Sequence, residues 1–360
     1  MSAPVAVLCS FRLGGTDGVS IEARKWEWAL RELGFSTRRV AGELSDGLRP
    51  DDVWVPFLAI EPAPGARTEP DVLAAALAGS DLVVVENLCS LPLNERASTV
   101  AADVLADHIG RVLFHHHDLP WERAHLAHVA GLPPSRPNSL HVTINDRARA
   151  ALAERGYESV TIRNAFDLDP PPGDRAGTRA AFGFADDDIV VAQPTRAIAR
   201  KEVPRAIDYV EQLAGMLRRR VRLWITGPAE DGYGPELDRL VAGAAIPVTV
   251  GRAPHAGDAY AAADAVVFPS SWEGFGNPVI ESVVAHRPIA VAHYPVLEEL
   301  LALGFTFFSV DRPAELASWL EHPNAEPLDA NMVVAREHFD LAELPTRIDA
   351  ACATVGWNDW

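Results

Sequence analysis

The stretch SSWEGFGNPVIES, from Ser270 to Ser282, places two glutamates on either side of a glycine-rich turn. The apolar run Ala265–Phe268 before it predicts a strand, and Asn277-Pro278 predicts a helix start, because Asn is a good N-cap and Pro suits the first helical position. Glycines let backbone approach a ligand, and the free N–H groups of a helix start bind anions. Glu273 and Glu281 can accept hydrogen bonds from hydroxyls. The stretch suits a ligand with phosphate and several hydroxyls, such as a nucleotide sugar; a plain surface turn is an equally weighted alternative.

Short apolar runs alternate with helical patterns on both sides of this stretch. The predicted strands are Val5–Leu8, Ser36–Val40, Leu82–Val85, Arg111–Phe114, Val142–Ile144, Ser159–Ile162, Ile189–Gln193, Arg222–Thr226, Pro247–Val250, Ala265–Phe268 and Pro288–Ala292. The predicted helices include Ser20–Leu33, Thr178–Phe182, Val203–Met216, Pro235–Ala242, Asp258–Ala262 and Pro278–Ala285. Such alternation is typical of βαβ units around a parallel sheet. Ligands of these sheets bind beyond the carboxyl ends of the strands, where the glycine-rich turn lies.

The length and one proline-rich segment predict two domains. A chain of 360 residues exceeds one ordinary core, and domains of roughly 150 to 200 residues are expected. Three consecutive prolines in DLDPPPGD, Asp167 to Asp174, cannot continue a helix or a central strand. We expect a Rossmann-like domain at 1–168, a linker at 169–177, a second Rossmann-like domain at 178–338, and a helical segment at 339–360 that could pack back on the first domain.

The composition argues against several classes of partner. The formal net charge of −18 disfavours a nucleic-acid partner and a polybasic membrane patch. No apolar run approaches the ~18 residues of a membrane span, and no basic segment precedes the apolar N-terminal run as in a signal peptide. The cysteines Cys9, Cys89 and Cys352 are few and widely spaced, which fits reduced thiols and a cytoplasmic location. The sequence does not indicate the oligomeric state.

A second candidate site follows the predicted strand Ile189–Gln193, in PTRAIARKEVPRA, Pro194 to Ala206. Arg196 and Lys201 could reach one diphosphate, because arginine offers a forked contact and lysine a mobile point charge. Lys25 and Lys201 are the only lysines among the 32 basic residues, so a lysine at this position favours a specific role. Solvated charge at a helix start is the alternative, although cations are slightly unfavourable there.

Two further stretches follow predicted strands of the first domain. SFRLGGTDGVS, Ser10 to Ser20, contains Gly14 and Gly15 but departs from G-x-G-x-x-G, so it predicts a loop facing a phosphate or an acceptor, with a plain turn as the alternative. In FHHHDLPW, Phe114 to Trp121, neighbouring residues of an extended segment point in alternate directions, so three consecutive histidines suit one metal ion poorly. We expect no metal and one histidine that offers a hydrogen bond; a histidine satisfied in the core is the alternative.

Taken in order, these motifs resemble the retaining GT-B glycosyltransferases of family four. EGFGNPVIE resembles the family's E-x7-E signature, PTRAIARK its Arg…Lys diphosphate motif, GGTDGVS its N-terminal glycine loop, and His117-Asp118 its first-domain histidine pair. TIRNAFD, Thr161 to Asp167, resembles the end of the first domain, and ITGPAEDGYG, Ile225 to Gly234, a strand and loop of the donor domain. The resemblance implies an α/β GT-B fold, in which two Rossmann-like domains, one on the acceptor side and one that binds a nucleotide sugar, face across a cleft.

The resemblance also implies roles for the matching residues. Glu281 would bind the ribose and Glu273 the transferred sugar, while Arg196 and Lys201 would neutralise the departing diphosphate, which is the electrostatic part of catalysis. His117 would contact the sugar or the acceptor. The remaining implied positions are Gly274, Phe275, Gly276, Asn277 and Gly227 for donor binding, and Gly14 and Gly15 for the glycine loop of the cleft. Glu202 stands where the family usually has Gly after the motif lysine, which is a departure on the acceptor side.

The expected function is that of a metal-independent, cofactor-free hexosyltransferase that retains the anomeric configuration. Its partners would be a nucleotide-diphosphate sugar and an acceptor hydroxyl, which the lack of a basic amphipathic face assigns to a soluble small molecule. Two alternatives share the fold: a non-catalytic sugar-nucleotide-binding protein and a sugar-nucleotide epimerase. Intact Glu273, Arg196 and Lys201 count against the first, and the lack of an obvious further acid–base set near the sugar counts against the second.

Overall fold

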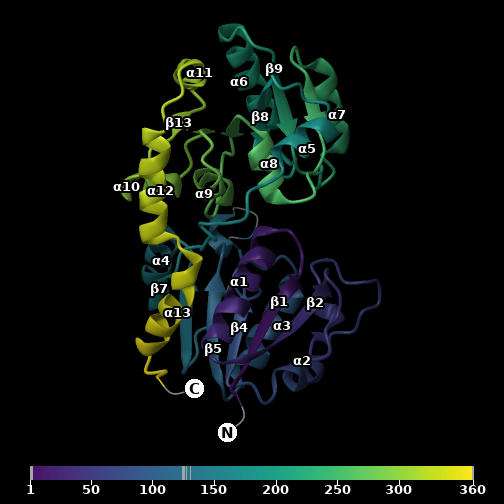
Figure 1. Cartoon of the computed structure of the whole chain (residues 1–360). Coiled ribbons are helices and arrows are strands. Elements are labelled where there is room, and N and C mark those ends of the chain that lie inside the picture. Colours follow the sequence, from purple (N-terminus) through teal and green to yellow (C-terminus); the bar gives the residue numbers. More distant parts are fainter. Residues whose placement is uncertain (1–2, 124–125, 127, 130, 359–360) are drawn as a thin grey trace. The chain divides into compact units, whose positions relative to one another are not determined.

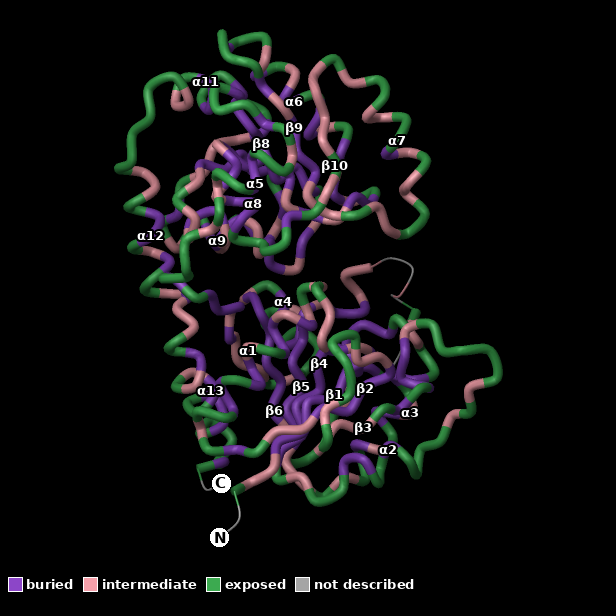
Figure 2. The backbone as a smooth tube through the Cα atoms, turned by 45° about the vertical axis from the view of Figure 1, so that its right-hand side comes forward, coloured by how far each residue is buried: buried purple, intermediate pink, exposed green. Residues whose placement is uncertain are grey.

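The computed structural model describes residues 3–123, 126, 128–129 and 131–358. The chain divides into two compact units, one that combines Met1–Ala165 with Leu341–Trp360 and one that comprises Phe166–Asp340. Each unit is built on its own parallel sheet, and the buried residues concentrate along the strands (Figure 1; Figure 2). Two parallel sheets, each with its own helices, confirm the predicted α/β fold class with two Rossmann-like domains.

In the described part of the first unit, seven strands form a sheet of order β3-β2-β1-β4-β5-β6-β7, and every neighbouring pair is parallel. The strands are β1 (Val5–Leu13), β2 (Ser36–Leu44), β3 (Val53–Trp54), β4 (Leu82–Glu86), β5 (Arg111–His116), β6 (Ser139–Thr143) and β7 (Ser159–Thr161). Alternate side chains of a strand point to opposite faces, so Leu8 enters one hydrophobic core while Val7 and Cys9 enter another. Both faces of this sheet are therefore buried, as is usual for parallel sheets.

Helices cover both faces of the first sheet. The helices of this unit are α1 (Gly18–Glu32), α2 (Pro70–Leu77), α3 (Glu95–Ala106), α4 (Asp146–Ala153) and α13 (Leu344–Ala353). Trp26 of α1 and Ile348 of α13 lie in one core and are almost inaccessible to solvent. Residues of α2 and α3 fill the core on the opposite face. Helix α13, although distant in sequence, thus completes the core of the first unit.

The second unit contains a parallel sheet of order β10-β9-β8-β11-β12-β13. Its strands are β8 (Ile189–Gln193), β9 (Val221–Ile225), β10 (Val248–Val250), β11 (Ala265–Phe268), β12 (Ile289–Val291) and β13 (Phe308–Ser309). Its helices are α5 (Arg175–Ala181), α6 (Val203–Met216), α7 (Gly234–Gly243), α8 (Ala256–Ala262), α9 (Asn277–Val284), α10 (Leu297–Ala302), α11 (Pro313–Glu321) and α12 (Glu326–His338), and a 3-10 turn, η4 (Ala199–Lys201), follows β8. Because β8 and β11 are neighbours, the loops after them meet at one edge of the sheet.

The two ends of the second unit lie side by side. The backbone N–H of Phe166 donates to the carbonyl of Phe339 at 2.7 Å, and Phe166 forms an isolated parallel bridge with Asp340. The side chains of Phe166 and Phe339 also flank Phe275, with ring centroids 6.2 and 5.7 Å from it. The segments through which the chain enters and leaves this unit are thus held together by backbone and aromatic contacts.

Local sequence signals located the elements around the site well. The bounds of β8, α6 and β11 agree with those predicted. Helix α9 differs by one residue, because Gly276 is its N-cap and Asn277 is already its first helical residue. The prediction of Asn277 as the cap was therefore wrong: Gly276 adopts the left-handed conformation, with φ of 95°, that turns the chain into the helix.

Among the described residues, no helix has both the length and the apolar character that crossing a membrane requires.

Candidate active site

Glu273 is held by two cations from the turn that follows the neighbouring strand, β8. Lys201 lies at the end of η4, after β8, and Glu273 lies in the loop after β11. The Lys201 ammonium donates to Oε1 of Glu273, and Nη1 of Arg200 donates to Oε2 at 2.9 Å. Nη1 of Arg200 also donates to the carbonyl of Trp272 at 3.2 Å. Two motifs that lie 72 residues apart in sequence therefore meet in one charged cluster.

The cluster is buried, which changes the acidity of its groups. The side chains of Lys201 and Glu273 are 9% and 8% exposed. Burial lowers the pKa of Lys201 to about 8, and the attraction of Glu273 only partly opposes this effect. Burial by itself would raise the pKa of Glu273, but Lys201 and Arg200 outweigh it and the pKa is lowered. Glu273 is thus a carboxylate at neutral pH, and Lys201 is a cation close to losing its proton.

Arg196 lies in the same loop but has a different partner. Its Nη1 donates to Oε2 of Glu230 at 2.6 Å, and its side chain is one-third exposed. Its positive charge is still near enough to lower the pKa of Lys201 further. Gly227 packs against this loop, because a Cβ at position 227 would lie 2.3 Å from the carbonyl oxygen of Thr195. Gly227 therefore allows the two loops that carry Arg196 and Glu230 to approach each other.

The glycine-rich turn before α9 is shaped by its neighbours. A Cβ on Gly276 would lie 2.3 Å from the hydroxyl of Tyr294, which itself donates to the carbonyl of Phe275 at 3.1 Å. The Phe275 ring is buried. Gly274 and Asn277 complete the turn between Glu273 and the helix. The turn thus places the N-terminus of α9 beside the charged cluster of Lys201, Arg200 and Glu273, and the free N–H groups of a helix N-terminus suit an anion.

Glu281 lies on α9 and is paired with Tyr260, a residue that was not predicted from the sequence. Its Oε2 accepts a hydrogen bond from the Tyr260 hydroxyl at 2.6 Å. Burial and the adjacent Glu281 raise the pKa of Tyr260 well above its ordinary value, so this hydroxyl remains a donor. Tyr260 fixes one carboxylate oxygen of Glu281 and thereby orients the other.

The first unit brings His117 together with Glu86 and His115. Glu86 ends β4 and is in register with His115 on β5. Oε2 of Glu86 accepts from Nδ1 of His115 and from Nε2 of His117, both at 2.8 Å. His116 points to the other face, where Nδ1 contacts the Ser90 hydroxyl at 2.5 Å and Nε2 contacts His141 at 2.9 Å. The histidines alternate in direction, as the extended backbone requires.

The Glu86 cluster has the dimensions of a small metal site, since one ligand atom from each of Glu86, His115 and His117 falls within 4.8 Å of the others. Nδ1 of His115 and Nε2 of His117, however, already donate to Glu86. The two imidazole donors and the shared oxygen of Glu86 satisfy one another, whereas Oε1 of Glu86 and Nε2 of His115 are buried without a hydrogen-bond partner within the described structure. This pair of histidines two residues apart, joined by a carboxylate from the next strand, was not predicted from the run of three.

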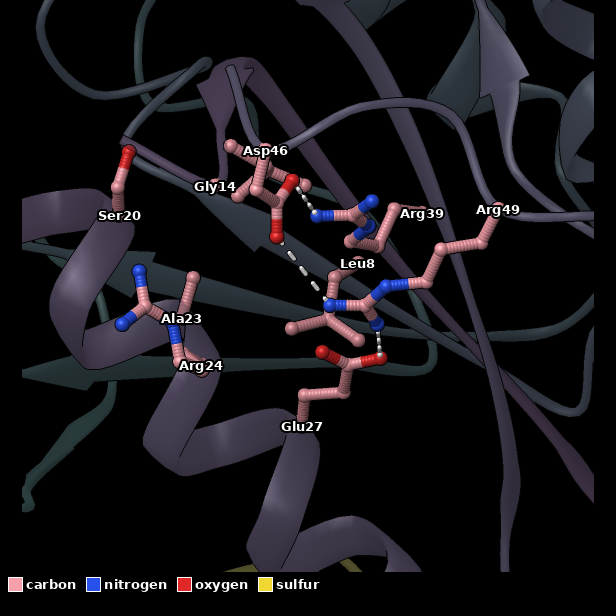
Figure 3. A pocket seen from close by; sticks show the side chains of 10 residues that line it. Leu8, Gly14, Ser20, Ala23, Arg24, Glu27, Arg39, Asp46 and Arg49 are labelled. Carbon is pink, nitrogen blue, oxygen red and sulfur yellow. Dashed lines mark hydrogen bonds and ion pairs between the residues drawn. The ribbon is translucent and has the colours of Figure 1, made fainter. Parts of the chain in front are cut away.

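Gly14 of the predicted glycine loop borders a small charged cavity (Figure 3), whereas Gly15 packs against Asp17 and Ser20. Gly14 has φ of 77°, and a Cβ there would collide with the Asp46 side chain. Asp46 pairs with Arg39 at 2.6 Å, and Arg49 bridges Asp46 and Glu27 at 3.4 and 2.7 Å. The cavity measures about 10 Å³, which is room for about one water molecule. Close packing against Asp46 therefore explains Gly14 without a ligand in this cavity.

Arg200, Glu86 and Tyr260 contact predicted site residues but were not themselves predicted from the sequence. Arg200 had a detectable signal, because it directly precedes Lys201 in the motif. Glu86 had a weaker one, as a lone acid at the end of the apolar run LVVVE. Tyr260 had none, because its partner Glu281 lies 21 residues further along the chain and only the fold brings them together.

The chain is similar to known glycosyltransferases. Residues 191–322 match the family described as Glycosyl transferases group 1. Mannosylglucosylglycerate synthase of Thermotoga maritima is 26% identical over 94% of this chain and 97% of that protein. The synthase of the same name from Petrotoga mobilis is 25% identical over 86% and 87%.

Solved structures show the same architecture. HepE of Anabaena, in complex with UDP-glucose, superposes with a TM-score of 0.75 at 18% identity over 97% of this chain and 99% of that chain. Sucrose-phosphate synthase of Thermosynechococcus elongatus gives 0.76 at 16% identity over 98% and 99%. The resemblance inferred from the motifs is confirmed by the family match, by relatives aligned along most of the chain and by the fold. The chain has the GT-B fold, and its residues 191–322 match the Glycosyl transferases group 1 family.

Proposed function

We propose that this glycosyltransferase moves a hexose from a nucleotide-diphosphate sugar to a hydroxyl of a soluble small molecule, with retention of the anomeric configuration and without a metal ion or cofactor. The relatives aligned along most of the chain are named for a product, mannosylglucosylglycerate, that is a small glycoside. A structure of the same fold holds UDP-glucose. Glucosylglycerate is accordingly the first acceptor to examine, with GDP-mannose and UDP-glucose as the first donors.

The observation that carries this proposal is the meeting of Lys201, Arg200 and Glu273 beside the N-terminus of α9. Cations and helix N–H groups suit a diphosphate, whereas a carboxylate suits sugar hydroxyls. A ligand that has both features in one molecule fits this combination. Glu273 itself pairs with both cations.

A bound nucleotide sugar would separate Glu273 from Lys201 and Arg200 and take its place. The diphosphate takes Lys201 and Arg200, and Arg196 adds charge from the same loop. Glu273 is then released to accept hydrogen bonds from the hexose hydroxyls, and Glu281, oriented by Tyr260, accepts from the ribose. Stabilising the departing diphosphate lets the acceptor hydroxyl attack from the face that the diphosphate leaves and pass its proton to a diphosphate oxygen, which retains the configuration. The protein then contributes positioning and electrostatic stabilisation, and no protein nucleophile is required.

The test is a transfer assay on the intact chain, with the donors and acceptor named above and the product analysed by NMR. We expect a product of retained anomeric configuration, formed equally well with and without EDTA. Lys201→Ala and Glu273→Ala should each lower kcat/KM by on the order of 100-fold, as loss of a charge-stabilising contact does. Arg205→Ala is the matched control, because Arg205 pairs at the surface with Asp311.

Other outcomes would identify the alternatives. A new epimer formed from the donor alone indicates an epimerase. Tight binding of a nucleotide sugar, without its hydrolysis and without transfer to the acceptor named above, indicates a binding protein. Wild-type turnover in both Lys201→Ala and Glu273→Ala would show that the cluster is not the active site.

A further inference from the structure

Glu86, His115 and His117 belong to a larger buried network of charged groups in the first unit. Glu86 is fully buried, and His115 and His117 are 1% and 6% exposed. Glu22 of α1 is also buried, and its Oε1 pairs with the ammonium of Lys25 at 2.5 Å. The negative charge of Glu22 acts on both imidazoles and favours their protonated forms. Lys25, the second lysine of the chain, thus has a place in this network.

The charges of this network balance only when one imidazole is protonated. Glu22 and Glu86 contribute two negative charges and Lys25 one positive charge, while the nearby Asp118 is balanced by its ion pair with Arg123, so a single imidazolium makes the sum zero. An uncompensated charge in a buried site is costly, and neutralisation of the network is therefore favoured. The hydrogen bonds to Glu86 do not by themselves decide which imidazole carries the proton, since each donates to Glu86 over the same 2.8 Å.

The surroundings assign the proton to His117. His115 is enclosed, with the Trp26 ring 4.2 Å from its own, and its Nε2 is buried without a hydrogen-bond partner within the described structure. A proton on this Nε2 would be an unsatisfied buried donor, and burial lowers the pKa of His115. Burial would also lower the pKa of His117, but Glu86, Glu22 and the adjacent Asp118 outweigh it and raise the pKa. An imidazolium that gives Nε2–H to Glu86 has Nδ1–H as its second donor, and it has no lone pair with which to accept a proton.

We propose that Glu86 is a positioning residue that keeps His117 as an oriented imidazolium, so that His117 serves the transfer reaction as a hydrogen-bond donor and positive charge and not as a general base. This inference rests on the proposed glycosyl transfer and on a role for His117 in it. The N–H of His117 would donate to an oxygen of the sugar or of the departing group, where negative charge is present or develops. Glu86 acts through His117 and does not itself contact the substrate.

The first experiment measures the protonation of His117 directly and does not depend on transfer. Histidine side chains of the intact, 15N-labelled protein are titrated by NMR, and His117→Gln identifies the resonance. We expect His117 to be protonated at neutral pH in the wild type, and its midpoint to fall by at least about one pH unit in Glu86→Gln. Ser90→Ala, which removes the partner of His116 on the other face, is the matched control and should leave the midpoint unchanged.

The second experiment tests the role in transfer. Gln keeps a donor but cannot accept a proton as a base does, so His117→Gln should retain roughly tenfold more kcat/KM than His117→Ala. Glu86→Gln should move the alkaline limb of the kcat/KM profile that belongs to His117 towards lower pH by the shift seen by NMR. Equal activity of His117→Gln and His117→Ala would overturn the donor role.

Three results separate this inference from its alternatives. A neutral His117 at neutral pH in the wild type, or an unchanged midpoint in a folded Glu86→Gln, contradicts the role of Glu86 whether or not the protein transfers sugar. Stoichiometric zinc that co-purifies with the wild type and is lost in Glu86→Gln also contradicts it, because the nitrogens would then serve as ligands. Absence of transfer with every donor, together with a protonated His117, contradicts the proposed function and leaves the imidazolium established.

Discussion

Lys201 occupies a position where lysine and arginine are not equivalent. The chain uses arginine almost throughout for positive charge, with Lys25 and Lys201 as its lysines. A guanidinium stays charged at any pH that a folded protein survives, whereas a buried ammonium can release its proton. Lys201 is buried against Glu273, and its pKa of about 8 places its proton loss just above neutral pH. The charge offered to a diphosphate therefore depends on pH.

We predict that the affinity of the free protein for a nucleoside diphosphate falls as the pH rises through about 8. The ammonium of Lys201 becomes neutral over this range, and its attraction for the ligand is lost. Lys201→Arg should bind more weakly but show no such fall, because its charge persists. Calorimetric titration with GDP and UDP between about pH 7 and pH 9 checks this, and that range lies above the phosphate pKa of about 6. An equal decline in both proteins would assign the pH dependence to another group.

The same proton has a consequence for stability. Because the folded-state pKa of Lys201 lies below its ordinary value of 10.5, the unfolded chain binds more protons than the folded chain between about pH 8 and that value. This residue's contribution to the free energy of unfolding therefore rises with pH over that window.

Gly276 combines a positive φ with close packing, so a side chain there should be harmful. We predict that Gly276→Ala lowers the free energy of unfolding by about 1–3 kcal/mol and raises the donor KM, because the turn before α9 must shift. Gly243→Ala is the control: Gly243 ends α7 and needs no positive φ, and a Cβ there would meet no atom within 4 Å outside its own helix. That substitution should be neutral or stabilise by up to about 1 kcal/mol. Similar denaturation midpoints for both variants would refute the packing argument.

At the scale of single residues, the composition of the site could be predicted from the sequence but its pairings could not. Lys201 and Glu273 were predicted on loops after two strands, and those loops are adjacent because β8 and β11 are neighbours. That Arg200 shares Glu273 and that Arg196 turns to Glu230 could not be predicted, because either arginine could bind a phosphate. Residue type and spacing determine which chemistry is available, whereas the choice of partner depends on side-chain directions that only the folded loops define.

At the scale of elements, apolar runs located the strands more reliably than they located the helices. Strands buried on both faces are continuous apolar runs bounded by polar residues, as in β4 and β8. Helix α13 lies in the segment 339–360, which was predicted to be helical and to pack back on the first domain, but neither its bounds nor its contacts were predicted. Its place in the core of the first unit depends on contacts with α1 that are distant in sequence, and local periodicity carries no information about them.

We predict that Ile348→Ala, in α13, lowers the free energy of unfolding by about 2–5 kcal/mol, because Ile348 is fully buried in the core shared with α1. Thr346→Ala on the exposed side of the same helix should change it by no more than about 0.5 kcal/mol. Urea denaturation followed by tryptophan fluorescence compares the two, since Trp26 lies in the affected core. A small effect of Ile348→Ala would mean that α13 is dispensable for this core.

At the scale of the whole molecule, the chain forms two units that each have a sheet and hydrophobic cores of their own. The Lys201–Glu273 cluster lies entirely within the second unit, and the Glu86 network entirely within the first. The division of labour predicted from the sequence assigns donor binding to the second unit and acceptor contacts to the first. It can be examined by dividing the chain.

We predict that residues 166–340, produced alone, unfold cooperatively and bind a nucleoside diphosphate. The segment contains its complete sheet and the entire cationic cluster, so neither depends on the remainder of the chain. Its Kd for GDP or UDP should lie within roughly tenfold of that of the intact chain, and Lys201→Ala in the segment should weaken it. Loss of all binding in a cooperatively folded segment would show that the first unit contributes to the diphosphate site.

The hydrogen bond between Phe166 and Phe339 has a further consequence for how this chain can change. A unit whose two ends are neighbours can be removed or replaced as one segment, because only a short connection is needed to join the flanking chain. Exchange of the segment between related transferases should therefore carry sugar-donor preference with it and leave the surrounding domain's connectivity intact. Recombination at these two junctions would give natural or engineered lineages a route to new donor and acceptor combinations without redesigning either half.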